Sequence, residues 1–100
     1  MRFFIKIGVL ETIHGEYDVV ARKAIGEQLQ KLAASGKMEN GGAFGDSRGG
    51  YMVLNVDSPA ELRELLGLPL LVNAHIESHP LTTFEELAAF FKKHAATTDT

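Results

Sequence analysis

The sequence predicts one α+β domain whose elements follow the order β-α-β-β-α-β, with one more helix at the carboxyl end. Three observations indicate this: four segments of alternating apolar and polar residues, helical spacing of apolar residues between them, and glycine, proline or capping residues at the junctions. A chain of 100 residues has room for a single hydrophobic core. We therefore expect one domain over residues 1–94 and a frayed tail over residues 95–100.

The first two elements are a strand and a long helix. In residues 2–9, apolar side chains fall on every second position, which is the period of a strand. Residues 16–35 carry apolar side chains near helical spacing, Val20 among them, and Gly36 follows at a typical C-cap position. Gly26 lies inside this helix, where glycine costs up to about 1 kcal/mol relative to alanine. We therefore expect a close packing contact at Gly26.

A glycine-rich hairpin and a second helix come next. Residues 37–46 contain three glycines, which indicates an irregular edge strand, and residues 50–57 alternate as a regular strand. The Ser-Pro-Ala-Glu segment 58–61 combines an N-cap hydroxyl, a proline at the first helical position and a carboxylate that can complete a capping box. We expect this helix to end at Gly67 and residues 68–71 to form an apolar bridge.

The fourth strand and the last helix complete the pattern. Residues 72–80 alternate between apolar side chains and four polar ones, Asn73, His75, Glu77 and His79. Thr83 and Glu86 can cap the last helix, whose apolar stripe consists of Leu87, Phe90 and Phe91. With right-handed crossovers this order gives a ferredoxin-like fold, in which an antiparallel four-stranded sheet has the strand order 4-1-3-2.

Alternation sorts the side chains of the strands onto two faces of this sheet. The face expected beneath the first two helices carries Phe3, Ile5, Ile7, Val9, Met52, Leu54, Val56, Val72, Ala74 and Ile76. The opposite face carries Phe4, Lys6, Tyr51, Val53, Asn55, Asn73, His75, Glu77 and His79. This second face is too polar for a dry core and too rich in large side chains for open solvent. We expect the same face of a second copy to cover it, with the last helix bracing the homodimer.

Composition excludes several classes of protein. The chain has no cysteine, which excludes a disulfide scaffold, thiolate catalysis and cysteine-built zinc sites. No apolar run approaches the ~18 residues of a membrane span. The net charge is −3 and the basic residues form no patch, whereas nucleic-acid binding requires one. We expect a cytoplasmic protein with neither a nucleic-acid nor a membrane partner.

The segment 67–81 has a distinctive pattern. It reads Gly-Leu-Pro-Leu-Leu-Val-Asn-Ala-His-Ile-Glu-Ser-His-Pro-Leu, a Gly-Leu-Pro-Leu bridge followed by a polar-apolar strand that ends in Pro-Leu. In this it resembles the muconolactone isomerases. The short first strand, the Ser-Gly-Lys helix exit at 35–37 and the Gly-Tyr strand start at 50–51 also align. The resemblance covers about four-fifths of the chain and is carried by structural motifs more than by catalytic ones.

The resemblance implies a dimeric α+β barrel, often built into larger rings. It also implies a small lactone or related organic acid bound in the cavity, with a proton moved between two of its carbon atoms, as in aromatic catabolism. That chemistry needs no metal and no cofactor. A non-catalytic small-ligand-binding or accessory dimer of the same fold, or a cofactor-free monooxygenase, is the alternative.

Proton transfer beside a carbonyl requires a base and a donor that stabilises the developing enolate. Glu77 and His75 are the candidate bases, while Lys6, Tyr51 or Asn55 could polarise the carbonyl oxygen. Lys6 could instead pair with a substrate carboxylate. The further substrate-binding candidates are Phe4, Asn73, His79, His14 near the end of the first strand, and Lys37 at the helix exit.

Several of these candidates have a structural alternative. Lys6 and Glu77 can form an ordinary cross-strand ion pair. His14 can be a solvated loop residue, and Lys37 can simply complement the helix dipole. His75, Glu77 and His79 share residue types with metal sites, but alternate side chains on a straight strand are about 7 Å apart, so we expect no metal.

Overall fold

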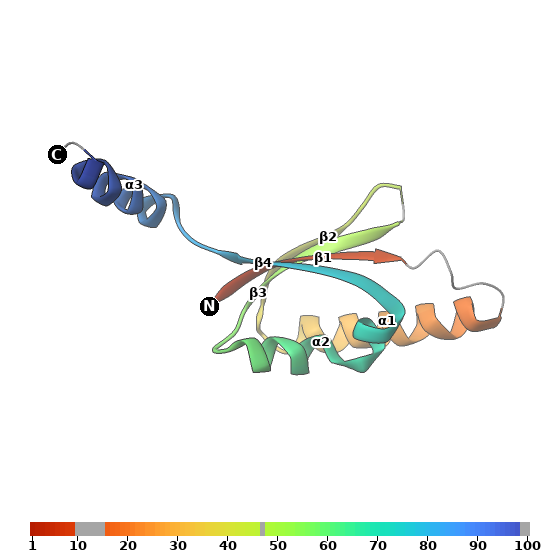
Figure 1. Ribbon diagram of the computed structural model, residues 1–100. Helices are drawn as coiled ribbons and strands as arrows, with labels where there is room; N and C mark the ends of the chain where they lie inside the picture. The colour runs from red at the N-terminus through yellow and green to blue at the C-terminus, as the bar shows by residue number, and fades with distance from the viewer. Residues whose placement is uncertain (10–15, 47, 99–100) are drawn as a thin grey trace.

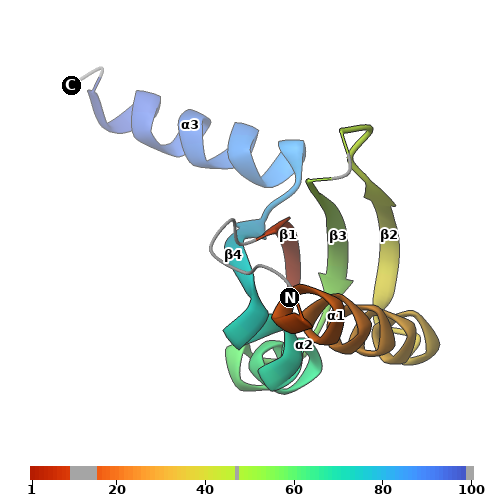
Figure 2. The same cartoon turned by 90° about the vertical axis from the view of Figure 1, so that its right-hand side faces the viewer.

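The computed structural model describes residues 1–9, 16–46 and 48–98. Its elements are, in order, β1 (Arg2–Val9), α1 (Glu16–Ala34), β2 (Met38–Ala43), β3 (Gly49–Asn55), α2 (Pro59–Asn73), β4 (Ala74–Leu81) and α3 (Phe84–Thr98). The strands form one antiparallel sheet in the order β2-β3-β1-β4, and α1 and α2 lie on one side of it (Figures 1 and 2). This confirms the ferredoxin-like fold.

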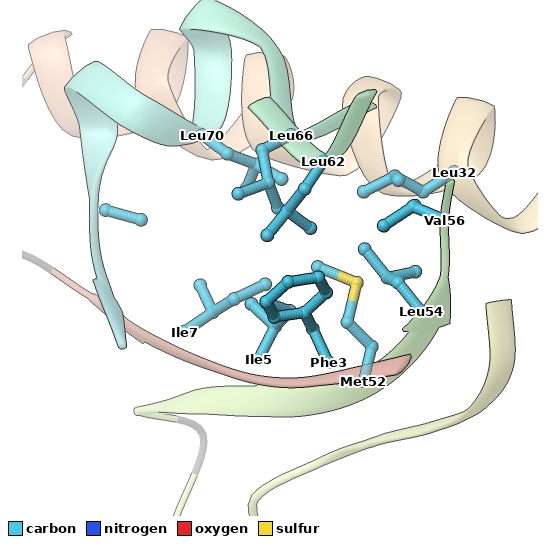
Figure 3. Packing of buried hydrophobic residues seen from close by; sticks show 11 residues of the cluster. Phe3, Ile5, Ile7, Leu32, Met52, Leu54, Val56, Leu62, Leu66 and Leu70 are labelled. Atoms are coloured by element: carbon cyan, nitrogen blue, oxygen red, sulfur yellow. The ribbon is translucent and has the colours of Figure 1, made fainter. Parts of the chain in front are cut away.

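One hydrophobic core fills the space between the two helices and the sheet. Leu32 of α1 and Leu62, Leu66 and Leu70 of α2 point toward the strands (Figure 3). The predicted helix-facing side chains meet them: Phe3, Ile5, Ile7, Met52, Leu54, Val56 and Ala74 are buried, and Ile76 is partly buried. Full burial of one large apolar side chain stabilises a fold by roughly 1.5–3 kcal/mol. The cluster therefore fixes which face of each strand turns inward.

α1 packs on the predicted stripe in its second half, where Leu32 is buried in the core and Leu29 packs against it, but its first half differs. Ala21 is buried on this helix, whereas Val20 is 68% exposed. Within the described part of the chain, a Cβ placed on Gly26 would meet no atom within 4 Å beyond the backbone of its own helix. The close contact expected at Gly26 is therefore absent, and glycine is not required there by packing.

α2 extends further than predicted because the chain resumes a helix after a kink. Gly67 takes φ 70° and ψ 165°, and residues 68–73 are helical again, so they are not a bridge. Pro69 lies in the first turn of this second segment, where its missing N–H costs little. The strand consequently begins at Ala74. Val72 is 62% exposed and Asn73 donates its side-chain amide to the Pro69 carbonyl at 2.9 Å, so the assignment of Val72 and Asn73 to the sheet faces was wrong.

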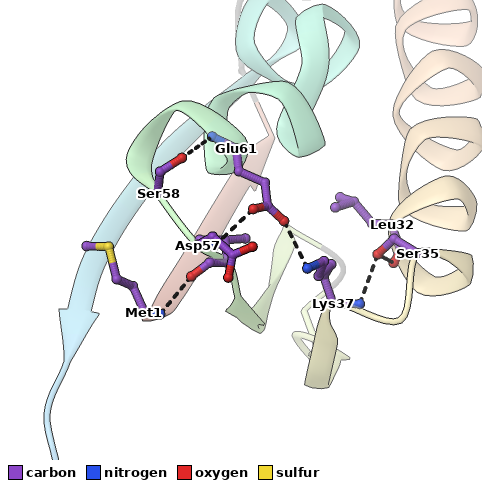
Figure 4. A network of polar contacts seen from close by, with 8 residues as sticks. Met1, Leu32, Ser35, Lys37, Asp57, Ser58 and Glu61 are labelled. Atoms are coloured by element: carbon purple, nitrogen blue, oxygen red, sulfur yellow. Dashed lines mark hydrogen bonds and ion pairs between the residues drawn. The ribbon is translucent and has the colours of Figure 1, made fainter.

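A polar cluster ties the start of α2 to the segment before β2 (Figure 4). The Ser58 hydroxyl accepts from the Glu61 backbone N–H at 3.1 Å, as the N-cap pattern predicts. The Glu61 carboxylate accepts from the Asp57 backbone N–H at 3.0 Å, one residue before the position that a capping box would use. Lys37 Nζ lies 3.2 Å from Glu61 Oε1. Two hydrogen bonds lower the pKa of Glu61 below its ordinary value of 4.5. The one from the Asp57 backbone has the larger effect and the one from Lys37 the smaller.

α3 stands clear of α1 and α2 in both ribbon views (Figures 1 and 2). The radius of gyration is 17.3 Å, against about 13 Å for a compact chain of this length, and the molecule measures 64 × 27 × 23 Å.

Thr83 and Glu86 form the predicted capping box at the start of α3, with nitrogen-to-oxygen distances of 3.0 and 3.4 Å. The helix continues through Thr98, beyond the start of the tail expected at Ala95. No helix in the described part of the chain is long and apolar enough to cross a membrane.

Replacing Gly67 with alanine should lower the free energy of unfolding. A non-glycine residue with left-handed φ costs about 1–2 kcal/mol. The added Cβ would also lie 2.9 Å from Gln28 Nε2, the amide nitrogen that donates to the Leu65 carbonyl at 2.7 Å. Gly26→Ala is the matched control and should raise stability by up to about 1 kcal/mol. Urea unfolding measures both variants, and equal effects at the two glycines would contradict the kink.

Replacing Glu61 with glutamine should weaken the loss of stability in acid. A carboxyl group whose folded pKa lies below its unfolded value stabilises the fold above the unfolded pKa, here near 4.5, and loses this contribution as the pH falls through the folded pKa. Glutamine does not titrate, so Glu61→Gln should show a shallower decrease of the urea midpoint from about pH 5 downward. Glu64→Gln, on an exposed position of the same helix, is the control. An unchanged pH profile in Glu61→Gln would contradict the polar cluster.

Candidate functional site

Three polar side chains lie in one row across the sheet face that is turned away from α1 and α2. Backbone pairing sets Lys6 of β1 opposite Tyr51 of β3 on one side and opposite Glu77 of β4 on the other. Directly paired residues on antiparallel strands share a face, and their Cβ atoms are about 4.5–5.5 Å apart. The register therefore places a phenol, an ammonium and a carboxylate side by side, and the predicted neighbourhood of Lys6 and Glu77 is confirmed.

A line of aromatic rings runs beside this row. The ring centroids of Phe44 and Tyr51 are 6.5 Å apart at an interplanar angle of 21°, and those of Tyr51 and Phe4 are 6.0 Å apart at 18°. The ring of His79 continues the line at 6.5 Å from Phe4. Phe44 was not among the predicted site residues, because it follows the last residue of β2, where strand alternation no longer determines the direction of a side chain. Together the rings give the face an apolar band next to its charged groups.

Glu77 has a partner on its own strand. Its carboxylate Oε2 lies 3.3 Å from His79 Nε2, and the two side chains are 50% and 58% exposed. Within the described chain no ion pair joins Lys6 to Glu77, so the cross-strand pair offered as the structural alternative is not formed. Alternate side chains on a straight strand are about 7 Å apart, so the side chains of Glu77 and His79 must bend toward each other to reach 3.3 Å. Lys6 is exposed and lies opposite Tyr51 in the pairing of β1 with β3.

Some of the remaining candidates lie on the same face as the row, and others lie on the helix side or in α2. His75 is exposed on the same face, where it pairs with Gly8. Asn55 is on the same face at its far end, where its amide donates to Glu39 at 3.3 Å. Lys37 pairs with Glu61 on the helix side and Asn73 belongs to α2, so neither joins the row. His14 lies outside the described residues. No group of three side chains suited to hold a metal ion occurs in the described part of the chain.

A separate hollow lies on the helix side of the sheet, beneath α1 and beside the β2–β3 hairpin. Its volume is about 490 Å³. The lining residues are Ile7, Gly8, Ile25, Leu29, Met38, Gly41, Gly42, Ala43, Phe44, Gly49, Gly50, Tyr51, Met52 and Ala74. Tyr51 is the one titratable residue among them, and it also belongs to the polar row. Sequence reasoning missed this cavity because alternation identifies a face but does not show where small residues leave it unfilled.

Comparison with known proteins identifies the fold. The structure is similar to the crystal structure of muconolactone isomerase, with a TM-score of 0.66 and 21% sequence identity over 83% of this chain and 90% of that one. It is also similar to 5-chloro-2-hydroxyhydroquinone dehydrochlorinase from Burkholderia phenoliruptrix, in complex with 2,5-dihydroxybenzoquinone, with a TM-score of 0.60 and 15% identity over 86% and 98% of the two chains. No protein-family model and no curated protein matches the sequence. The chain has a muconolactone isomerase-like fold.

Proposed function

We propose that this protein moves a proton between two carbon atoms of a small lactone or carbonyl acid without a cofactor. The reaction takes place on the sheet face that is turned away from α1 and α2, here called the open face. The row formed by Tyr51, Lys6 and Glu77 is the observation that carries the proposal, because it brings a base and two oxygen-binding donors together. The likeness in fold to muconolactone isomerase supports it.

Glu77 is the base in this proposal. Its carboxylate takes the proton from the carbon next to the substrate carbonyl, and the electron pair of the broken C–H bond moves toward the carbonyl oxygen. Lys6 or the Tyr51 hydroxyl stabilises the enolate that forms, and Glu77 then returns the proton to a second carbon of the conjugated system. His79 holds the carboxylate at 3.3 Å and so orients it. His75, paired with Gly8 one step along the face, is the second candidate base.

The aromatic line favours a planar, unsaturated substrate. Phe4 and Tyr51 stack at a ring separation of 6.0 Å, and both are only half-buried. Partly exposed aromatic faces attract flat conjugated molecules through offset stacking. Lys6 lies beside these rings and can pair with a carboxylate on such a molecule. A conjugated lactone that carries an acid group meets both requirements.

A second copy of the chain completes the site in this proposal. Glu77 and His79 are half exposed in the single chain, whereas proton transfer gains from the exclusion of water. α3 is exposed along its described side chains, including Phe84 at 89%. Exposed apolar side chains gathered on one side of a projecting helix are typical of a surface that a partner covers. Two copies related by a twofold axis would cover both open faces and the stripe of α3.

A non-catalytic ligand-binding dimer is the alternative. The contact between Glu77 and His79 favours it, because the imidazole nitrogen lies 3.3 Å from a carboxylate oxygen that proton transfer would need free. Both functions use the same face and the same ligand class. Exchange of substrate protons with solvent separates them, since only the catalyst breaks a C–H bond.

Deuterium exchange tests the proposed chemistry. Muconolactone incubated with the protein in heavy water should gain deuterium beside its carbonyl, as followed by proton NMR. Removal of a general base typically costs 10²–10⁴-fold in rate, so Glu77→Gln should slow exchange by about 100-fold or more. Lys6→Met should also slow it, and Glu64→Gln on α2 should not. Exchange that survives both Glu77→Gln and His75→Ala would remove the base assignment, and saturable binding without exchange would establish the alternative.

Sedimentation tests the proposed dimer. The wild-type chain should sediment as a dimer or a multiple of one. Replacing Phe90 and Phe91 with serine should yield a monomer, because these side chains are 55% and 61% exposed in the single chain and contribute nothing to its core. Circular dichroism checks that the variant is folded. A folded double variant with the wild-type sedimentation coefficient would contradict the role of α3.

A further inference from the structure

We propose that the cavity between α1 and the β2–β3 hairpin is a second binding site, which takes a small uncharged aromatic molecule. It lies on the helix side of the sheet, whereas the Tyr51–Lys6–Glu77 row faces the other way. Its volume of about 490 Å³ is within the range of about 300–1,000 Å³ of small-molecule sites. This inference does not depend on the proposed chemistry, because Tyr51 is the one residue of the row among the described lining residues and the other lining residues take no part in the row.

The cavity exists because one corner of the sheet lacks large side chains on its inner face. Register sets Gly41 opposite Met52 and Ala43 opposite Gly50, so the strands offer little beneath the helix there. Ile25 and Leu29 of α1 lie above this corner. An apolar ligand that covers this apolar lining removes it from water, which is favourable.

Backbone geometry explains only some of these small residues. A Cβ on Gly49 would lie 1.9 Å from the Ile7 carbonyl oxygen, and one on Gly50 would lie 2.6 Å from the Gly42 carbonyl oxygen, so both positions require glycine. Ala43 and Ala74 already carry a Cβ and are under no such backbone constraint. The small side chains at these two positions keep the cavity open, although the backbone does not require small residues there.

The lining indicates the chemical class of the ligand. None of the described lining residues is charged, so they offer an ion no partner for the hydration that it would lose. Met38 and Met52 contribute polarisable thioethers, which make favourable contacts with aromatic rings. Phe44 and Tyr51 are the aromatic residues among the described lining residues. A neutral molecule of one or two rings suits this environment, and an organic anion does not.

Methionine methyl signals can report occupancy directly. The chain contains three methionines, of which Met38 and Met52 line the cavity and Met1 does not. Titration of the wild-type protein, labelled with ¹³C in its methionine methyl groups, with toluene should shift the Met38 and Met52 signals saturably and leave the Met1 signal in place. Benzoate, which has the same ring with a charge, should not produce these shifts. Toluene should also raise the melting temperature in a concentration-dependent way.

Variants that fill the cavity complete the test. Ala74→Leu should weaken toluene binding by about tenfold or more, because added methylene groups take the space of the ligand. Ile25→Phe fills the cavity from the helix side and is the variant to measure if Ala74→Leu does not fold. Ala33→Leu on the exposed side of α1 is the matched control and should bind normally. Glu77→Gln should also bind toluene normally, so this result is independent of the exchange experiment. Equal shifts at all three methionines, no shift at saturation, or normal binding by a folded cavity-filling variant would overturn the proposal.

Discussion

The antiparallel pairing of β1 with both β3 and β4 is the constraint on which both faces of the molecule depend. β1 is central in the sheet, and its register sets Lys6 between Tyr51 and Glu77. A slip of one residue would carry these side chains to the helix side and expose the apolar set. The burial of Ile5 and Leu54, both fully inaccessible to solvent, opposes such a slip. The core therefore fixes the position of the polar row.

The arrangement of the sheet was predictable because alternation is a local property that the core reinforces. Ile5 and Met52 turn inward as their spacing indicates, and the helices over them follow from the same pattern. The boundary between α2 and β4 was not predictable in this way. Gly67 and Pro69 usually end a helix, yet here the left-handed turn at Gly67 lets a second helical segment form, with Pro69 where it is tolerated. Asn73 consequently leaves the predicted site.

The site was predictable only as far as register could be inferred. Strand order and parity together identified Lys6, Tyr51 and Glu77 as residues of one face. The ion pair of Lys37 with Glu61 was not predictable, because it depends on the path of the chain between α1 and β2. Phe44 escaped prediction because the glycine-rich segment 37–46 has no regular alternation that would assign its side chain to a face. The cavity escaped because its lining joins two strands, a hairpin and a helix through residues that are mostly small.

β3 links the two surfaces that we assign to ligands. Tyr51 and Met52 are neighbours in the chain but point to opposite faces, as consecutive residues of a strand must. Tyr51 takes part in the aromatic line and the polar row, and Met52 is buried under the helices beside the cavity. Gly49 and Gly50 precede them at close backbone contacts that leave this end of the strand little freedom. A ligand in the cavity would therefore press on the same short segment that positions Tyr51, so the two sites share one structural support even though they share little of their chemistry.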